Sequence, residues 1–361
     1  MARKNKTKTD LGVLTEDLGM QINAFPKLIS LDYSNPPRLV MKLEKEAAGF
    51  FKKGKRYINM QENSACFEAW CLIIKAQTNN PDLEIELDVK DITDASYPGG
   101  KPANGHLGRF LYRILKFSEQ YKWFKLSHDL KKIKEKFKNY LDSTSFKTNA
   151  PSKEAEDDLD KLSNKGLESY VEQLLVDDNN QKEILKLSSA SAIVGRQLPV
   201  GLYEDNKDNK DNEDNKDNEE VCIGGTAAAD FWAVDGDTIK VYELKSNNPM
   251  VGIITEIFFY TNYVYDVFIA GYLDHNKGVV SHQTNVKLRN YDQIKGEQVQ
   301  GIMISNRKDE KKDNIKGWHT SLKDASSRNQ IIDQMNKNGT DGKIQYGWIE
   351  YNFKMSITVT P

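Results

Sequence analysis

The chain has 361 residues, of which 38% are hydrophobic and 29% are charged. This length allows one large domain or two ordinary ones, and the apolar fraction is enough for a buried core in either case. No run approaches the roughly 18 consecutive apolar residues that a membrane-spanning helix needs, and no secretory signal follows the basic N-terminus. The composition therefore predicts a soluble, cytoplasmic protein without a membrane partner.

The three cysteines are too few and too irregularly spaced for a disulfide framework, which fits a reducing compartment. Cys66 and Cys71 lie in an apolar stretch, where core packing is the simplest role. The formal net charge of −2 does not by itself indicate a nucleic-acid binder. Acidic residues concentrated in one insertion would, however, hide a basic working surface elsewhere.

Residues 1–155 are expected to form a mainly helical region that binds DNA or regulates access, with residues 83–89 as one candidate strand. Within residues 104–142, apolar side chains recur at helical spacing and predict one or two amphipathic helices. Their basic faces carry Arg109, Arg113 and Lys116, which are candidates for contact with phosphate groups. A solvated helix face is the alternative interpretation.

A polar segment at residues 147–165, which contains Pro151, is interpreted as a linker with a domain boundary near residue 155. Residues 156–361 then follow an α/β pattern. The expected elements are a helix at 167–176, a strand at 192–203, strands at 227–234 and 238–244 joined by a turn with an Asp-Gly pair, a helix at 251–265, strands at 267–272 and 299–305, a helix at 328–336 and a strand at 344–351.

The insertion at residues 204–220 repeats Asp, Asn and Lys and contains no apolar residue. Such a segment does not repay its ordering entropy, so the composition predicts a disordered loop between two neighbouring strands. Its period of three and its lack of a turn glycine exclude an EF-hand.

The strand at 238–244 ends in Glu243-Leu244-Lys245, and alternate side chains of a strand share one face. Asp230 lies near the start of the partner strand and therefore opposes the end of this one. Two carboxylates and one ammonium are thus predicted to converge. Carboxylate oxygens suit Mg²⁺, and a bound metal suits phosphodiester hydrolysis because it lowers the pKa of a coordinated water and neutralises charge on the phosphate. Lys245 is expected to act either as the catalytic base or as a group that orients the nucleophile or stabilises the transition state.

This pattern resembles the PD-(D/E)XK superfamily of restriction-endonuclease-like nucleases, which carry an acid on one strand and Glu-X-Lys on the next. Asp230 and Glu243-Leu244-Lys245 match that pattern, with 12 residues between the two acids. Ala229 stands where the family often has proline. The resemblance implies an α/β fold with a restriction-endonuclease-like mixed sheet flanked by helices.

The resemblance also implies further site residues. The family places a glutamate on the helix before the sheet, and Glu168 is favoured over Glu172 as that residue and as a third metal ligand. Glu256 and Tyr260, one turn apart on the following helix, and Gln197, on the preceding strand, are expected to support the site.

The implied activity is that of a Mg²⁺-dependent endodeoxyribonuclease of restriction or defence type, with Mn²⁺ as a substitute metal. DNA is the expected partner and RNA the alternative. Cutting both strands with one site per chain implies a homodimer. Two other interpretations stay open: a catalytically inactive nuclease-like module that binds nucleic acid or protein, and a plain salt bridge between Glu243 and Lys245. The separation of the Asp230, Glu243 and Glu168 carboxylates is the measurement that distinguishes them.

Overall fold

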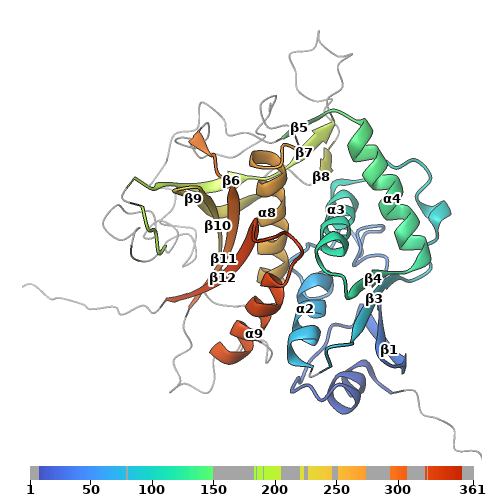
Figure 1. Ribbon diagram of the computed structural model, residues 1–361. Coiled ribbons are helices and arrows are strands. Elements are labelled where there is room, and N and C mark those ends of the chain that lie inside the picture. Colours follow the sequence, from blue (N-terminus) through green and yellow to red (C-terminus); the bar gives the residue numbers. More distant parts are fainter. Residues whose placement is uncertain are drawn as a thin grey trace, which may run out of the picture.

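The computed structural model places two mixed sheets on either side of a group of central helices (Figure 1). It describes residues 8–78, 80–148, 183, 185–189, 191–204, 220–222, 227–245, 251–273, 293–306, 322 and 324–351. The molecule is α/β, with mixed sheets flanked by helices. Within the described residues, no helix has both the length and the apolar character required to cross a membrane. The predicted helix at 167–176, with Glu168 and Glu172, the predicted domain boundary and the linker from residue 149 onward lie outside the described residues.

A four-stranded sheet near the N-terminus makes the expectation of a mainly helical region wrong. Its strands alternate between inward and outward side chains, as in β3, where Ile85, Leu87 and Val89 are buried. The alternating stretches of the first two strands are short and rich in polar residues. The longer stretches with helical spacing therefore gave the stronger signal in this part of the sequence. In sheet order the strands are β1 (Ile29–Asn35), β2 (Arg38–Leu43), β3 (Glu84–Val89) and β4 (Phe124–Leu126).

Two long helices occupy the segment that was predicted to hold one or two. Each begins at a polar residue whose side chain accepts a hydrogen bond from a backbone N–H of the first turn, Asn104 from Leu107 and Ser127 from Leu130. The helices of this half are α1 (Asp10–Gly12), η1 (Val13–Asp17), α2 (Phe67–Gln77), η2 (Asp94–Ser96), α3 (Gly105–Gln120) and α4 (His128–Ser143).

The second sheet has five strands in the order β12-β11-β10-β9-β6. The strands β6, β9 and β10 form an antiparallel meander, and β11 and β12 run parallel to β10. The parallel connections pass through helices, as such crossovers require. The elements are β6 (Ile193–Pro199), β9 (Ala228–Asp235), β10 (Thr238–Lys245), α8 (Gly252–Phe268), β11 (Gln298–Asn306), α9 (Ala325–Asn336) and β12 (Ile344–Tyr351).

Two predicted strands differ from the structure. The strand expected at 192–203 is divided into β6, which ends at Pro199 and pairs with β9, and β7 (Leu202–Glu204), which belongs to another sheet. β7 joins β5 (Phe146–Thr148) and β8 (Glu220–Cys222) in a small antiparallel sheet. The strand expected at 267–272 is wrong, since α8 extends to Phe268 and a turn with Gly271 at a φ of 63° follows it.

One continuous hydrophobic cluster joins the two halves of the chain. It includes Trp70 of α2, Phe117 of α3, Phe258 of α8 and Trp232 of β9, all of which are buried. Helix α2 packs against both α8 and α9. The opposite face of the five-stranded sheet is also buried, around Tyr242. Residues on the α8 side of β10 therefore point into the middle of the molecule.

Candidate active site

The hairpin of β9 and β10 brings the two predicted acids opposite each other. Its two-residue turn contains Gly236 at a φ of 63°, which glycine tolerates without strain. Phe231 pairs with Tyr242, and the same register continued by one residue sets Asp230 against Glu243. One carboxylate oxygen of Asp230, Oδ2, accepts a hydrogen bond from the backbone N–H of Leu244 at 2.7 Å. The predicted convergence of this pair is thus present.

Helix α8 adds a second glutamate to the face of β10 that carries Glu243 and Lys245. The Lys245 Nζ lies 2.7 Å from Glu243 Oε1 and 3.1 Å from Glu256 Oε2. The exposed fractions of Glu243 and Glu256 are 3% and 5%. The interpretation as an ordinary surface salt bridge is therefore wrong, because the lysine joins two acids inside the protein.

The charges of this cluster strongly perturb one another. Burial raises the pKa of Glu243 well above its usual value, and the Asp230 and Glu256 carboxylates raise it further. Burial opposes the charged form of Lys245, but the surrounding carboxylates outweigh it and raise the pKa of its ammonium. The raised pKa favours the ammonium form of Lys245, which donates hydrogen bonds and has no acceptor.

Tyr260 lies one helical turn after Glu256 and is 5% exposed. Burial, followed by the charges of Glu243, Glu256 and Asp230, raises the pKa of its hydroxyl well above the usual value. The hydroxyl therefore stays protonated and is a neutral donor beside the acids. This placement agrees with the supporting position expected for Tyr260.

Gln197 lies in the β6 strand next to the acids. Arg196 pairs with Phe231 and Leu198 with Ala229, so Gln197 falls opposite Asp230. Its backbone has a φ of 52°, a left-handed conformation that costs a non-glycine residue free energy. Gln197, Asp230 and Glu243 consequently form one row across three adjacent strands, an arrangement that supports the expected role of Gln197.

Two of the three predicted phosphate-binding cations have internal partners instead. Arg113 donates from Nε to Glu68 Oε1 at 2.6 Å and from Nη2 to the other oxygen of the same carboxylate. Lys116 lies 2.7 Å from Asp266 of α8. These contacts hold helices together and account for both cations without a ligand. Arg109 differs, being 7% exposed on the turn before Arg113.

A further buried acid, Glu68, connects the helices behind the site. Its Oε2 accepts a hydrogen bond of 3.2 Å from the Thr255 hydroxyl, and Thr255 precedes Glu256 on α8. Glu68 therefore fixes the turn of α8 that delivers Glu256 to Lys245. The sequence contains no local signal for this role, because 187 residues separate the two partners.

The donor set suits a hard divalent cation. Glu243 Oε2 is buried and has no hydrogen-bond partner within the described residues, which is the chemistry expected of a metal-facing carboxylate. Within the described residues, no three His, Cys, Asp or Glu side chains are already grouped as metal ligands. Lys245 instead neutralises Glu243 and Glu256 in this arrangement. Asp230 and Glu243 are the acids best placed to hold a cation.

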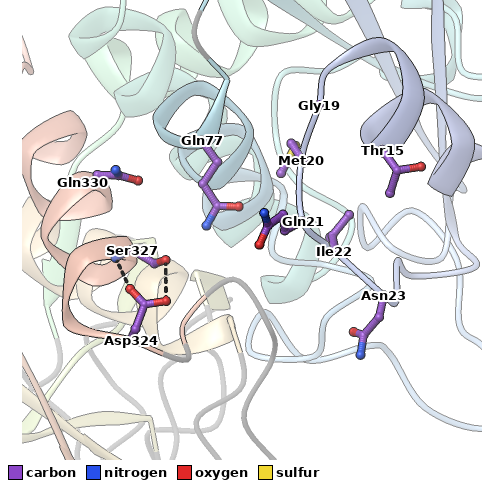
Figure 2. Close-up of a pocket in the computed structure, with 10 residues that line it drawn as sticks. All are labelled: Thr15, Gly19, Met20, Gln21, Ile22, Asn23, Gln77, Asp324, Ser327 and Gln330. Carbon is purple, nitrogen blue, oxygen red and sulfur yellow. Dashed lines mark hydrogen bonds between the residues drawn. The ribbon is translucent and has the colours of Figure 1, made fainter.

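A separate pocket of about 750 Å³ opens between η1, the end of α2 and the start of α9. Figure 2 shows that amide and hydroxyl groups dominate its polar lining. Its carboxylate, Asp324, accepts hydrogen bonds from Ser327 and caps α9. None of the clustered acids lines this pocket, so we place no chemistry there.

No family model matches the chain, and comparisons with curated proteins and with solved structures found no match.

Proposed function

We propose that the protein is a Mg²⁺-dependent phosphodiester hydrolase, a DNA endonuclease of restriction-endonuclease-like type. The observation that carries this proposal is the row of Asp230 and Glu243 on adjacent strands, with Lys245 between Glu243 and Glu256. The mixed sheet, with α8 directly after the Glu-X-Lys strand, is the arrangement that the resemblance implies. It supports assigning the cluster to hydrolysis rather than to structure alone.

In the proposed mechanism, Asp230 and Glu243 would hold the metal, with Glu168 as the third carboxylate. Bound Mg²⁺ supplies charge neutralisation at the scissile phosphate and a lower pKa for a coordinated water. Lys245, kept protonated by its acidic neighbours, donates a hydrogen bond to the attacking water or to a phosphate oxygen. Glu256 fixes the direction of the Lys245 ammonium. The Tyr260 hydroxyl, which stays neutral, is a hydrogen-bond donor beside the acids.

Isosteric amides at the two acids test this proposal. The full chain is incubated with duplex DNA, single-stranded DNA and RNA, with Mg²⁺ or Mn²⁺, and Mg²⁺ binding is measured separately by calorimetry. We expect Asp230→Asn and Glu243→Gln to lose metal affinity and to lower cleavage on the order of 100-fold or more. The matched control is Asp237→Asn, an exposed carboxylate of the same hairpin, which should cleave normally.

Lys245→Ala is a poorer test, because it leaves Glu243 and Glu256 buried without their cation and so threatens the fold itself. A wild-type chain that binds neither Mg²⁺ nor Mn²⁺ and cuts no substrate would refute the proposal and favour the inactive module. Cleavage that survives in Glu243→Gln would instead show that the assignment of the ligands is wrong.

A further inference from the structure

The start of α3 is held unusually close to the strand β8. A Cβ atom added at Gly108 would lie 1.6 Å from the carbonyl oxygen of Val221, so only glycine permits this approach. The next residue is Arg109. Its backbone position is consequently fixed by the packing of two elements, and its side chain is directed into the molecule with an exposed fraction of 7%.

Arg109 has no hydrogen-bond or ion-pair partner among the residues that the structure describes. Arg113, one turn later on the same face, has both oxygens of Glu68 and the carbonyl of Ala65. Burial, and then the charge of Arg113, lowers the pKa of Arg109 to about 10, while Tyr260 and Glu256 oppose this shift. A buried guanidinium without a hydrogen-bonded anion is costly and is expected to have a partner that the chain itself does not provide.

The neighbours of Arg109 show where that anion would bind. Tyr260 and Glu256 both belong to the face of α8 that meets Lys245. Arg113, one turn later on α3, and Thr255, next to Glu256 on α8, bind the same carboxylate of Glu68, so this part of α3 lies beside the turn of α8 that carries Glu256. The five N–H donors of the Arg109 guanidinium have a fixed geometry, which matches the several oxygens of a phosphate better than the one oxygen of a hydroxyl.

We propose that Arg109 is a phosphate-binding residue of the candidate active site, and that its partner is a backbone phosphate of the nucleic-acid substrate. This inference rests on the proposed function. It makes the site composite, with metal-binding acids from the second sheet and a phosphate-binding guanidinium from α3. It also separates Arg109 from Arg113 and Lys116, whose charges are already satisfied inside the protein.

The alternative is that Arg109 serves only to offset the charges of the buried carboxylates. The two roles predict opposite changes in stability. If Arg109 is a structural counter-ion, Arg109→Gln leaves the acids less compensated and lowers the Tm. If its partner is the substrate, the same change removes an unpaired buried charge, so the Tm stays the same or rises.

The test uses full-length Glu243→Gln, which is expected not to cleave, as the parent for binding measurements. Binding of a short fluorescent duplex and of the matching single strand is followed by anisotropy at several KCl concentrations, well below the Tm and without divalent metal. We expect Arg109→Gln to weaken binding by about tenfold and to reduce the salt slope by about one. Arg109→Lys should restore part of the affinity, and Lys42→Gln, at an exposed position on β2, should behave like the parent.

The possible outcomes distinguish this inference from the proposed function. A parent that binds neither oligonucleotide refutes both. A parent that binds, with Arg109→Gln unchanged in affinity and salt slope, overturns the role of Arg109 and leaves the proposed function standing. A lower Tm for Arg109→Gln with unchanged binding assigns Arg109 to charge compensation.

Discussion

At the residue scale, the candidate site holds more carboxyl groups than cations. The carboxylates of Asp230, Glu243 and Glu256 act on the same ammonium, Lys245, and Arg109 is the next cation. Buried charges are tolerated when they are paired, so an excess of acids favours an added cation. The excess explains why we propose metal binding at this cluster rather than at the pocket near α9, whose one carboxylate, Asp324, caps a helix.

His106 provides a pH-dependent measure of the same region. Its ring stacks on Tyr57 with 4.8 Å between the ring centroids, and its Nδ1 is buried without a hydrogen-bond partner in the described structure. Burial, followed by the charge of Arg109, lowers the pKa of His106 from 6.5 to about 4, although a hydrogen bond with the Ile58 backbone opposes the shift. Protonation therefore favours the unfolded chain.

We predict that the free energy of unfolding decreases as the pH falls from 6.5 through about 4. The stabilisation from neutral His106 is complete above pH 6.5 and is lost below it, because the folded-state pKa is the lower one. Since the side chain is partly exposed, its share is about 1–2 kcal/mol. Urea titrations at several pH values should show a smaller decrease for His106→Phe, which keeps a ring against Tyr57.

The control is His128→Phe, at an exposed position on α4, whose pH profile should match that of the wild type. Equal slopes for the wild type and His106→Phe would mean that His106 titrates normally and that its surroundings are wetter than the geometry indicates. Comparing slopes rather than absolute stabilities removes the contribution of carboxylates that titrate in the same range.

Sequence reasoning found the residues whose relation is local. Glu243 and Lys245 share a strand face because they are two positions apart, and the turn residues set Asp230 against them. The pattern also selected Arg109, but grouped it with two cations that are internally paired. Neither the left-handed backbone of Gln197 nor the contact of Glu68 with Thr255 has a local signature, because each arises from packing between distant segments.

At the element scale, close backbone contacts position the helices that carry site residues. Gly108 brings α3 against β8, and Gly252 allows the start of α8 to lie against the carbonyl of Gln61, where an added Cβ would be only 2.0 Å away. Long helices were predicted well because their spacing repeats over many residues. The end of α8 was not predicted, because a short apolar run such as residues 267–273 suits a strand and a buried helix equally.

The contact at Gly108 gives a prediction about this element. Gly108→Ala must move the backbone of Val221 or of α3 and should destabilise the protein by about 2 kcal/mol or more. Helix propensity alone would favour alanine by up to about 1 kcal/mol, so destabilisation identifies the clash. Thermal unfolding measures the effect, and DNA binding should weaken because Arg109 moves with the turn.

Gly99→Ala is the matched control, since nothing lies within 4 Å of its added Cβ. We expect it to leave both Tm and binding unchanged. A stable Gly108→Ala variant with normal binding would show that α3 has room to shift away from β8, which would weaken the structural basis for fixing Arg109 in place.

At the scale of the whole molecule, polar contacts cross between the helices of the two halves. Asp266 of α8 accepts hydrogen bonds from Tyr112 at 2.6 Å and from Lys116 at 2.9 Å. Gln120 donates to Asn262 at 2.5 Å, and Tyr121 donates to the carbonyl of Met335 at 2.8 Å. Because the surrounding apolar residues belong to one cluster, the halves bury each other's helices. The sequence located these helices but not their partners.

This shared core predicts a single unfolding transition for the described halves. Separating the halves would expose the apolar faces of α2, α3 and α8 together with several buried polar groups. This exposure costs more free energy than either sheet would gain by folding alone. The calorimetric enthalpy should therefore equal the van't Hoff enthalpy. Tyr112→Phe should lower the free energy of unfolding by about 1–3 kcal/mol, because it removes a hydrogen bond to the Asp266 carboxylate. The variant should still unfold in one transition.

Tyr33→Phe is the control for this comparison, since the Tyr33 hydroxyl has no hydrogen bond within the described residues and its loss should leave the Tm unchanged. Two resolved transitions in the wild type would instead mean that the sheets unfold independently. Arg109 and the acids would then belong to separable units, and the composite site would form only when those units dock. A single transition that Tyr112→Phe lowers makes assembly of the site part of folding itself.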